Sequence, residues 1–201
     1  MRGFGDAERE RIREQLRETG RDLFARYGLD KTTVADLTDP AGIATGTFYR
    51  FYDSKAELYY DVLREEGERL AEDIVAESFE AHDDPEEAIV AFLTLLCDEM
   101  ETNPLVRRLV ADDDMRRLTE QFGDGEMAAE RDESLSYLRP FIEEWQEEGR
   151  LRDGDPDALA GVLGVAKFVP YHREDFRDEE YYREVRDAFI ETLAAGLVRM
   201  E

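Results

Sequence analysis

The stretch from Thr33 to Leu58 reads T-V-A-D-L-T-D-P-A-G-I-A-T-G-T-F-Y-R-F-Y-D-S-K-A-E-L and decides the fold of this chain. Thr33 is of a residue type that begins helices, and Gly42 supplies the conformational freedom of a tight turn. Ser54 and Glu57 have the spacing of a capping box, which satisfies free backbone N–H groups at a helix start. The stretch therefore predicts a short helix, a glycine turn, a second short helix and the start of a third.

Two short helices joined by a glycine-containing turn are the arrangement that a DNA-reading helix-turn-helix requires. Residues 41–58, A-G-I-A-T-G-T-F-Y-R-F-Y-D-S-K-A-E-L, resemble the DNA-binding end of the TetR family of one-component transcriptional regulators. The family's core reads roughly A-G-V-S-K-G-T, then a hydrophobic residue, then Y-x-Y-F-x-S-K-x-x-L. The resemblance in specific residues covers residues 1–60, and beyond them it is architectural.

The sequence departs from the family pattern at three positions. Ala44 stands where a capping serine is usual, and Thr45 stands where a lysine is common. Pro40 stands where the family's second helix normally continues. Because proline lacks an N–H and clashes with the preceding turn of a helix, we expect this helix to end near Thr38.

Seven residues are candidates for contact with DNA. A helix start at Thr33 turns backbone N–H groups towards a phosphate, and threonine hydroxyl and methyl groups suit phosphates and bases. Gly46 lets the backbone approach DNA closely, while Phe48 packs in the core beneath. Taken singly, these residues also fit solvent-facing caps or ordinary packing. The candidates are Thr33, Thr45, Gly46, Thr47, Tyr49, Arg50 and Lys55.

The composition indicates a folded protein of one domain or two small ones. The chain has 201 residues, of which 42% are hydrophobic and 38% charged. No apolar run is long enough to span a membrane or to act as a signal peptide, and the single cysteine, Cys97, cannot form an intrachain disulfide. We therefore expect a soluble, cytoplasmic protein without a membrane partner.

The charge of the chain is strongly acidic and unevenly distributed. The net charge is −25, and the cations include only three lysines, Lys31, Lys55 and Lys167. Such a surface is typical of a halophilic, haloarchaeal-type protein, because salt screens its self-repulsion; an ordinary acidic protein is the alternative. Residues 1–58 carry a net charge of −1 and residues 59–201 carry −24. A segment that faces DNA phosphates needs a low net negative charge, because carboxylates repel phosphates.

The periodicity predicts an all-α fold. An N-terminal helix-turn-helix domain, residues 1–55, is expected to precede a helical effector-binding and dimerisation domain, residues 56–201. The fourth helix would be about 40 Å long at 1.5 Å per residue. The expected helices are 6–27, 33–38, 44–51, 54–80, 85–101, 104–111, 113–122, 126–148, 155–171 and 178–199.

Two late helices carry apolar stripes. In 126–148, Leu135, Leu138, Ile142 and Trp145 recur at spacings of 3, 4 and 3, and in 178–199 the apolar residues recur every four positions. Either stripe could equally be core. The family resemblance implies that these helices pair with those of a second subunit in a homodimer. The candidate interface residues are Leu138, Trp145, Val185, Phe189 and Leu193.

The family resemblance also implies a cavity for a small effector in the second domain. Apolar and aromatic residues on 85–101, 126–148 and 155–171 are the candidates, although the same residues would serve as plain core. They are Phe92, Leu96, Met100, Tyr137, Phe141 and Phe168. His82 and His172 lie far apart in the sequence, and neither has an adjacent His or Cys at metal-ligand spacing, so we expect no metal or cofactor. Cys97 is expected on a buried helix face.

Three functions compete. The leading one is a TetR-like repressor that binds double-stranded operator DNA as a homodimer and is released by a small apolar or amphipathic effector. An enzyme is disfavoured, since no nucleophile–base constellation, phosphate-binding glycine loop or metal cluster is apparent. The third is a helical ligand-binding or interaction protein that keeps this fold but no longer reads DNA; Pro40 and Thr45 motivate it.

Overall fold

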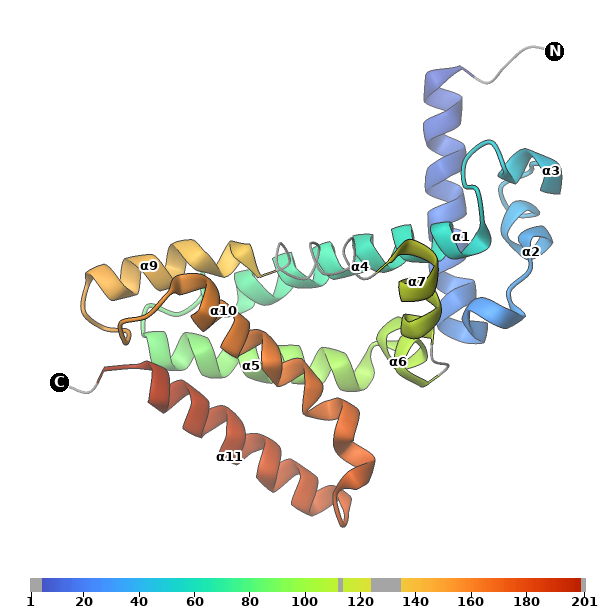
Figure 1. The fold of residues 1–201 in the computed structure, drawn as a ribbon. Helices are drawn as coiled ribbons and strands as arrows, with labels where there is room; N and C mark the ends of the chain where they lie inside the picture. The colour runs from blue at the N-terminus through green and yellow to red at the C-terminus, as the bar shows by residue number, and fades with distance from the viewer. Residues whose placement is uncertain (1–4, 112–113, 124–134, 200–201) are drawn as a thin grey trace. The chain divides into compact units, whose positions relative to one another are not determined.

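The structure is a computed structural model that describes residues 5–111, 114–123 and 135–199 of the chain. Within these ranges the chain is helical, and the one β-type feature is an isolated bridge between Leu151 and Val198. The predicted all-α fold is confirmed (Figure 1). The elements are α1 (Asp6–Lys31), α2 (Val34–Thr38), α3 (Thr45–Phe48), α4 (Lys55–Glu77), α5 (Pro85–Thr102), α6 (Pro104–Ala111), α7 (Asp114–Phe122), η1 (Ser136–Leu138), α9 (Arg139–Glu147), α10 (Pro156–Val165), η2 (Ala166–Phe168), η3 (Pro170–Asp175) and α11 (Glu179–Leu197).

Capping side chains fix several helix starts where the sequence predicts them. The Asp84 carboxylate accepts hydrogen bonds from the backbone N–H groups of Glu86 and Glu87, and Pro85 begins α5. The Asp155 carboxylate does the same for α10, accepting from the N–H of Asp157. Each cap satisfies donors that the first turn of a helix leaves free, so these starts are set locally by sequence.

Three expected helices differ from those observed. The expected helix 44–51 shrinks to α3, and the expected helix 155–171 divides into α10, η2 and η3. Pro170 begins η3, and its missing N–H accounts for the end of the regular hydrogen-bond ladder there. Of the expected helix 126–148, residues 126–134 lie outside the described residues; the remainder forms η1 and α9.

The chain forms two compact units. The first comprises Met1–Gly67 and Pro104–Gly123, and the second comprises Glu68–Asn103 and Asp124–Glu201. Helices α6 and α7 thus belong with the N-terminal helices, and α4 contributes to both units. The expected functional division into residues 1–55 and 56–201 stays a prediction, and it does not coincide with these units.

The core of the first unit lies where α1 and α4 pack together. A Cβ atom added at Gly20 would lie 3.1 Å from the Phe24 ring and 3.4 Å from the Val62 side chain, so the two helices approach closely there. The rings of Phe24 and Tyr59 lie 4.7 Å apart. The fully buried apolar side chains of these helices are Ile12, Leu16, Phe24, Leu58, Tyr59 and Val62.

Helices α6 and α7 are joined to the same unit by polar and aromatic contacts. The Arg108 guanidinium donates to the Arg26 carbonyl oxygen at 2.9 Å, near the end of α1. The Gln121 amide donates to the Ser54 hydroxyl at 2.8 Å, at the start of α4. The rings of Tyr60 and Phe122 stack at 4.8 Å. These contacts hold α6 and α7 to the ends of the two helices that carry α2 and α3.

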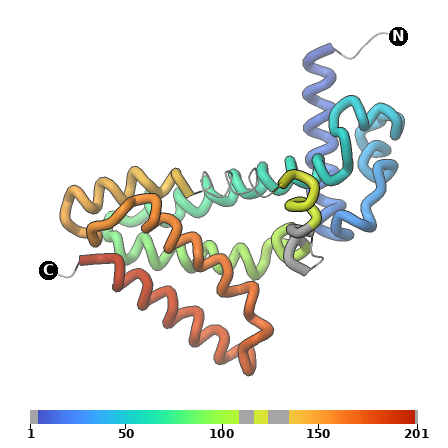
Figure 2. The backbone as a smooth tube through the Cα atoms, viewed as in Figure 1, coloured from blue at the N-terminus to red at the C-terminus, as the bar shows by residue number. Residues whose placement is uncertain are grey.

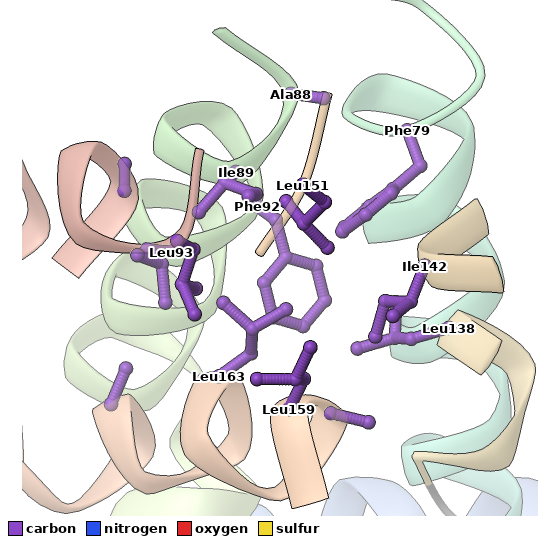
Figure 3. Close-up of a cluster of buried hydrophobic side chains, with 14 of the residues drawn as sticks. Phe79, Ala88, Ile89, Phe92, Leu93, Leu138, Ile142, Leu151, Leu159 and Leu163 are labelled. Carbon is purple, nitrogen blue, oxygen red and sulfur yellow. The ribbon is translucent and has the colours of Figure 1, made fainter. Parts of the chain in front are cut away.

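The core of the second unit is built around an aromatic group. Figure 3 shows the Phe92 ring in the middle of this core, beside Leu159 and Leu163. Phe79 stacks on Trp145 at 5.2 Å and meets Phe92 edge to face at 5.4 Å. The packing therefore draws α4, α5, α9 and α10 together.

The expected dimer contacts at Leu138 and Trp145 need correction. Both side chains are buried inside their own chain, with exposed fractions of 0% and 6%. They pack in the hydrophobic cluster of the second unit and present no surface to a second subunit. The 3, 4, 3 spacing on this segment thus reflects intrachain packing, which the same pattern fits equally well.

Gly28 permits a kink in α1, and its replacement gives a test of the first unit. Its φ of 75° and ψ of 176° lie in a region that is essentially restricted to glycine. We expect Gly28→Ala to lower the free energy of unfolding by about 1–3 kcal/mol, measured by urea denaturation at fixed KCl.

Gly67→Ala is the matched control for this measurement. Gly67 lies inside α4, and a Cβ atom added there would meet nothing within 4 Å. The control should raise stability by about 0.5–1 kcal/mol, since alanine favours the helix. Equal effects of the two substitutions would contradict the strained conformation at Gly28.

Candidate functional site

The start of α2 is a complete capping box. The Asp36 N–H donates to the Thr33 hydroxyl oxygen at 3.2 Å, and the Thr33 N–H donates to the Asp36 carboxylate at 2.9 Å. The Thr33 hydroxyl also donates to this carboxylate at 2.6 Å. These bonds, the hydroxyl bond foremost, hold the pKa of the Asp36 carboxyl below its ordinary value. The Thr33 hydroxyl is thus engaged within the chain, and a DNA contact through Thr33 stays a prediction.

The turn between α2 and α3 follows the sequence closely. Helix α2 ends at Thr38, as expected from Pro40. Gly42 has a φ of 67°, in the left-handed region that favours glycine. Ala44 precedes α3 without a side-chain cap, as expected from the missing serine. Pro40 and Gly42 thus account for the end of α2 and for the turn, whereas the start of α3 has no side-chain cap.

Helix α3 is anchored on one side and exposed on the other. The Phe48 side chain is fully buried, and its ring meets that of Tyr49 edge to face at 5.4 Å. Tyr49 nevertheless keeps 56% of its surface exposed. A Cβ atom added at Gly46 would meet nothing within 4 Å, so the backbone is open to an incoming partner there. The structure gathers five of the seven candidate residues on this short element and its end: Thr45, Gly46, Thr47, Tyr49 and Arg50.

The Lys55 side chain is bound to backbone carbonyl groups of its own chain. Its ammonium group donates to the Thr32 carbonyl oxygen at 2.6 Å and to the Asp30 carbonyl oxygen at 3.3 Å. These carbonyls lie at the end of α1, where a helix leaves acceptors unsatisfied and favours positive charge. Lys55 therefore positions the start of α4 against α1, and a phosphate contact by this side chain stays a prediction.

Most of the expected effector-pocket residues lie in one region of the second unit. Phe92, Leu96, Tyr137 and Phe141 belong to or pack against the core cluster of the second unit. Phe168 lies apart, 46% exposed, with its ring 5.9 Å from that of Tyr171. Burial raises the pKa of the Tyr137 hydroxyl to about 12. The assignment of these residues, including Met100 on α5, to an effector pocket stays a prediction.

Helices α10 and α11 run side by side (Figure 2). Residues of both helices line a groove of about 830 Å³. Three of the expected dimer residues, Val185, Phe189 and Leu193, line this groove. The sequence reasoning missed the contribution of α10, whose Val162 and Val165 are 40% and 53% exposed. The signal was present in the sequence, since this segment is apolar almost all round and such a helix is normally buried on several sides.

The remaining chemically notable side chains show ordinary environments. Cys97 is buried, and this burial raises the pKa of its thiol to about 11. His172 pairs with Asp175 at 2.9 Å and His82 lies 3.7 Å from Glu87. Across the described residues, no three His, Cys, Asp or Glu side chains are grouped to hold a metal ion. No helix in the described ranges has the length and apolar character needed to cross a bilayer.

Comparison with known proteins agrees with this geometry. Residues 16–62 match the family model described as bacterial regulatory proteins, tetR family. A TetR-family transcriptional regulator from Pectobacterium atrosepticum superposes with a TM-score of 0.77 at 24% identity, over 98% of this chain and 99% of that one. The chain has the TetR-type fold.

Proteins of known role resemble this chain either over a short stretch of sequence or over the whole fold. The transcriptional repressor KstR2 of Rhodococcus jostii is 42% identical over 52 residues, and the match spans 26% of this chain and 26% of that repressor. The protein RolR, solved in complex with the ligand resorcinol, superposes with a TM-score of 0.65 at 18% identity, over 98% of this chain and 99% of RolR. The sequence match to the curated repressor thus spans about a quarter of its length, whereas the fold agrees over nearly the whole chain.

The hydrogen bonds of Lys55 to the end of α1 predict how its replacement changes the stability of the protein. Lys55→Met removes a charged donor from two carbonyls, and we expect the free energy of unfolding to fall by about 1.5–3 kcal/mol. The measurement is urea denaturation followed by circular dichroism. Lys31→Met is the matched control, because Lys31 is exposed, and it should change stability by less than about 0.5–1 kcal/mol. Equal stability of the two variants would show that Lys55 does not brace α1.

Proposed function

We propose that this chain is a TetR-type transcriptional repressor that binds operator DNA through α2 and α3. The observation that carries this proposal is the exposed face of α3, set above a buried Phe48 within the segment that matches the tetR family model. A four-residue helix with an open glycine and an exposed tyrosine serves no packing purpose on its outer side. An element that enters a DNA groove requires such a face.

The exposed groups suit both kinds of DNA contact. The Tyr49 hydroxyl and the Arg50 guanidinium can donate to phosphate oxygens, which positions a protein on the duplex. Thr45 can offer a hydroxyl to a base edge and a methyl group to thymine. Gly46 allows the backbone to approach more closely than any other residue type would. Phosphate contacts are few, so shape and apolar contact carry much of the binding.

The repressor is proposed to act as a homodimer through α10 and α11. An isologous dimer carries two identical α2–α3 segments. These suit a pseudo-palindromic operator whose half-sites lie about 34 Å apart or a multiple of this spacing. The support is the groove between α10 and α11, whose floor includes Val185, Phe189 and Leu193. Phe189 and Leu193 are partly buried against the core of their own chain, and a second subunit would cover the rest of their surface.

A small apolar or amphipathic effector is proposed to bind the second unit and release the operator. The support is the apolar, aromatic composition of this unit and the fold shared with RolR, whose structure holds resorcinol. By linkage, an effector releases DNA only if it binds the released state more tightly than the DNA-bound state. We place the protein in the cytoplasm of a halophilic cell, since the net charge is −25 and lysine is nearly absent.

The test is a fluorescence-polarisation assay with the intergenic DNA upstream of the chain's own gene, in molar KCl. Tight binding that survives competitor DNA supports the proposal, and the same assay then screens effectors. If the folded, dimeric protein binds no DNA, the alternative of a helical ligand-binding protein that no longer reads DNA takes its place. The loss of the usual lysine at Thr45 is what favours that alternative.

Gly46→Ala separates DNA contact from folding. The added Cβ has open space in the free protein, so stability should rise by about 0.5–1 kcal/mol. In the complex the same atom stands between backbone and DNA, and we expect the operator dissociation constant to rise about ten-fold. Gly67→Ala, the stabilising control on α4, should leave DNA affinity unchanged.

Tyr49→Phe tests the phosphate contact with the ring packing retained. The ring still meets Phe48, so the fold should keep its stability, while DNA affinity should fall about three- to ten-fold through loss of one hydrogen bond. Unchanged affinity in both Gly46→Ala and Tyr49→Phe would show that α3 does not contact DNA.

A further inference from the structure

The side of α1 that faces α4 carries arginines at intervals of one helical turn. Arg9, Arg13 and Arg17 are four residues apart, so their side chains lie on the same face of the helix. The Arg17 guanidinium lies 3.5 Å from the Glu65 carboxylate on α4, and the Arg13 guanidinium lies 3.8 Å from the carboxylate of Glu10 on α1. Two of these three arginines therefore have an acidic partner.

Arg9 lies over an aromatic ring instead. Its guanidinium carbon is 5.6 Å from the centre of the Phe51 ring, within the distance at which the face of an aromatic ring attracts a cation. In the described parts of the chain, Arg9 forms no ion pair with a carboxylate. The chain has 51 acidic residues and 26 basic ones, so the lack of a carboxylate at this arginine is a specific feature of the surface. No direct partner offsets its positive charge.

Phe51 holds the arginine close to α3. Phe51 follows the end of α3 closely, its side chain is 9% exposed, and its backbone N–H donates to the Phe48 carbonyl oxygen at 2.8 Å. The next residue, Tyr52, donates its hydroxyl to the Asp61 carboxylate on α4 at 2.8 Å. The ring that the arginine contacts is thus fixed from two sides, next to the exposed face of α3.

A guanidinium in this position is suited to bind a phosphate. Attraction to the face of a ring holds the guanidinium while its N–H donors stay available for charge-assisted, bidentate hydrogen bonds with phosphate oxygens. Helix α3 itself, with the sequence T-G-T-F, carries no charged side chain. Arg9 brings a positive charge to this surface from a different helix. The candidates drawn from the sequence, all at Thr33 or later, did not include it.

We propose that Arg9, positioned by the Phe51 ring, is a further DNA-binding residue and contacts a backbone phosphate next to the groove that α3 enters. The inference rests on the proposed function, and it adds a contact from outside the helix-turn-helix. Such a contact neutralises one phosphate and fixes the orientation of α3 on the duplex, without reading the base sequence. Arg9 therefore contributes to the affinity for DNA of any sequence, and its contribution depends on salt.

The test is Arg9→Gln, measured by fluorescence polarisation on the intergenic DNA upstream of the chain's own gene at several KCl concentrations. We expect the dissociation constant at fixed KCl to rise about three- to ten-fold for each bound subunit. The plot of log affinity against log KCl should become shallower by about 0.9 for each bound subunit, because one phosphate contact is lost. Loss of a purely structural arginine would leave this slope unchanged. Urea denaturation at the same KCl concentrations establishes that the variant is folded.

Arg11→Gln is the matched control. Arg11 is exposed on the same helix, and its guanidinium donates to the Gln15 amide oxygen at 3.1 Å. Because two residues turn an α-helix by about 200°, Arg11 faces away from the side that carries Arg9. The control removes the same charge from the opposite side of α1, and its affinity and slope should match those of the unmodified chain. An equal effect of the two substitutions overturns the proposal, because the overall charge is then responsible.

Phe51→Leu tests the positioning role of the ring. Leucine keeps a buried apolar side chain at this position but offers no aromatic face to the guanidinium. We expect Arg9→Gln to cost less affinity in the Phe51→Leu chain than in the unmodified chain, because the guanidinium is no longer held beside α3. The same loss in both chains would reject Phe51 as the positioning residue.

The unmodified chain separates failure of this inference from failure of the proposed function. If it binds the DNA while Arg9→Gln leaves both the affinity and the slope unchanged, the proposal is overturned and the repressor function stands. If the unmodified chain binds no DNA at any KCl concentration at which it is folded, both are rejected.

Discussion

Burial of Phe48 is the interaction on which the candidate DNA-binding surface depends. Helix α3 has four residues, far fewer than the roughly 12–15 that a helix needs to be stable alone. Its conformation therefore comes from the fully buried Phe48 and Leu37 beneath it and from the Gly42 turn. The Phe48 ring also lies 5.9 Å from the ring of Tyr52, which is itself buried. Because these contacts hold the buried side of α3 in place, the exposed groups of this helix keep one orientation.

Electrostatics restrict how this surface can bind a phosphate backbone. The N-terminal segment is nearly neutral by count, yet several of its cations are already engaged. Arg21 pairs at 2.7 Å with Glu66, whose side chain is 6% exposed, and Arg17 lies 3.5 Å from Glu65. Lys55 is held by carbonyl oxygens of α1. The positive charge left to face DNA is smaller than the sequence suggests, which favours recognition by shape and by neutral donors over counterion release.

Local rules of the sequence predicted the local features well. The caps at Thr33, Asp84 and Asp155, and the stop imposed by Pro40, depend on residues within one helical turn of each other. How the helices pack against one another was harder to predict from the sequence. The stripe through Leu138 and Trp145 has the same spacing whether it meets its own chain or a second one, and only the arrangement of α5 and α10 decides. The direction of Lys55 depends on the end of α1, more than twenty residues earlier in the chain.

The membership of α6 and α7 in the first unit bears on how an effector could reach the DNA-binding surface. The chain passes between the units within α4, at Asn103–Pro104 and after Gly123, so a displacement in the second unit has three covalent routes into the first. Two of these routes lead to α6 and α7. Helix α6 contacts the end of α1 through Arg108, and α7 contacts the start of α4 through Gln121. Helices α2 and α3 lie in the chain between these same two points.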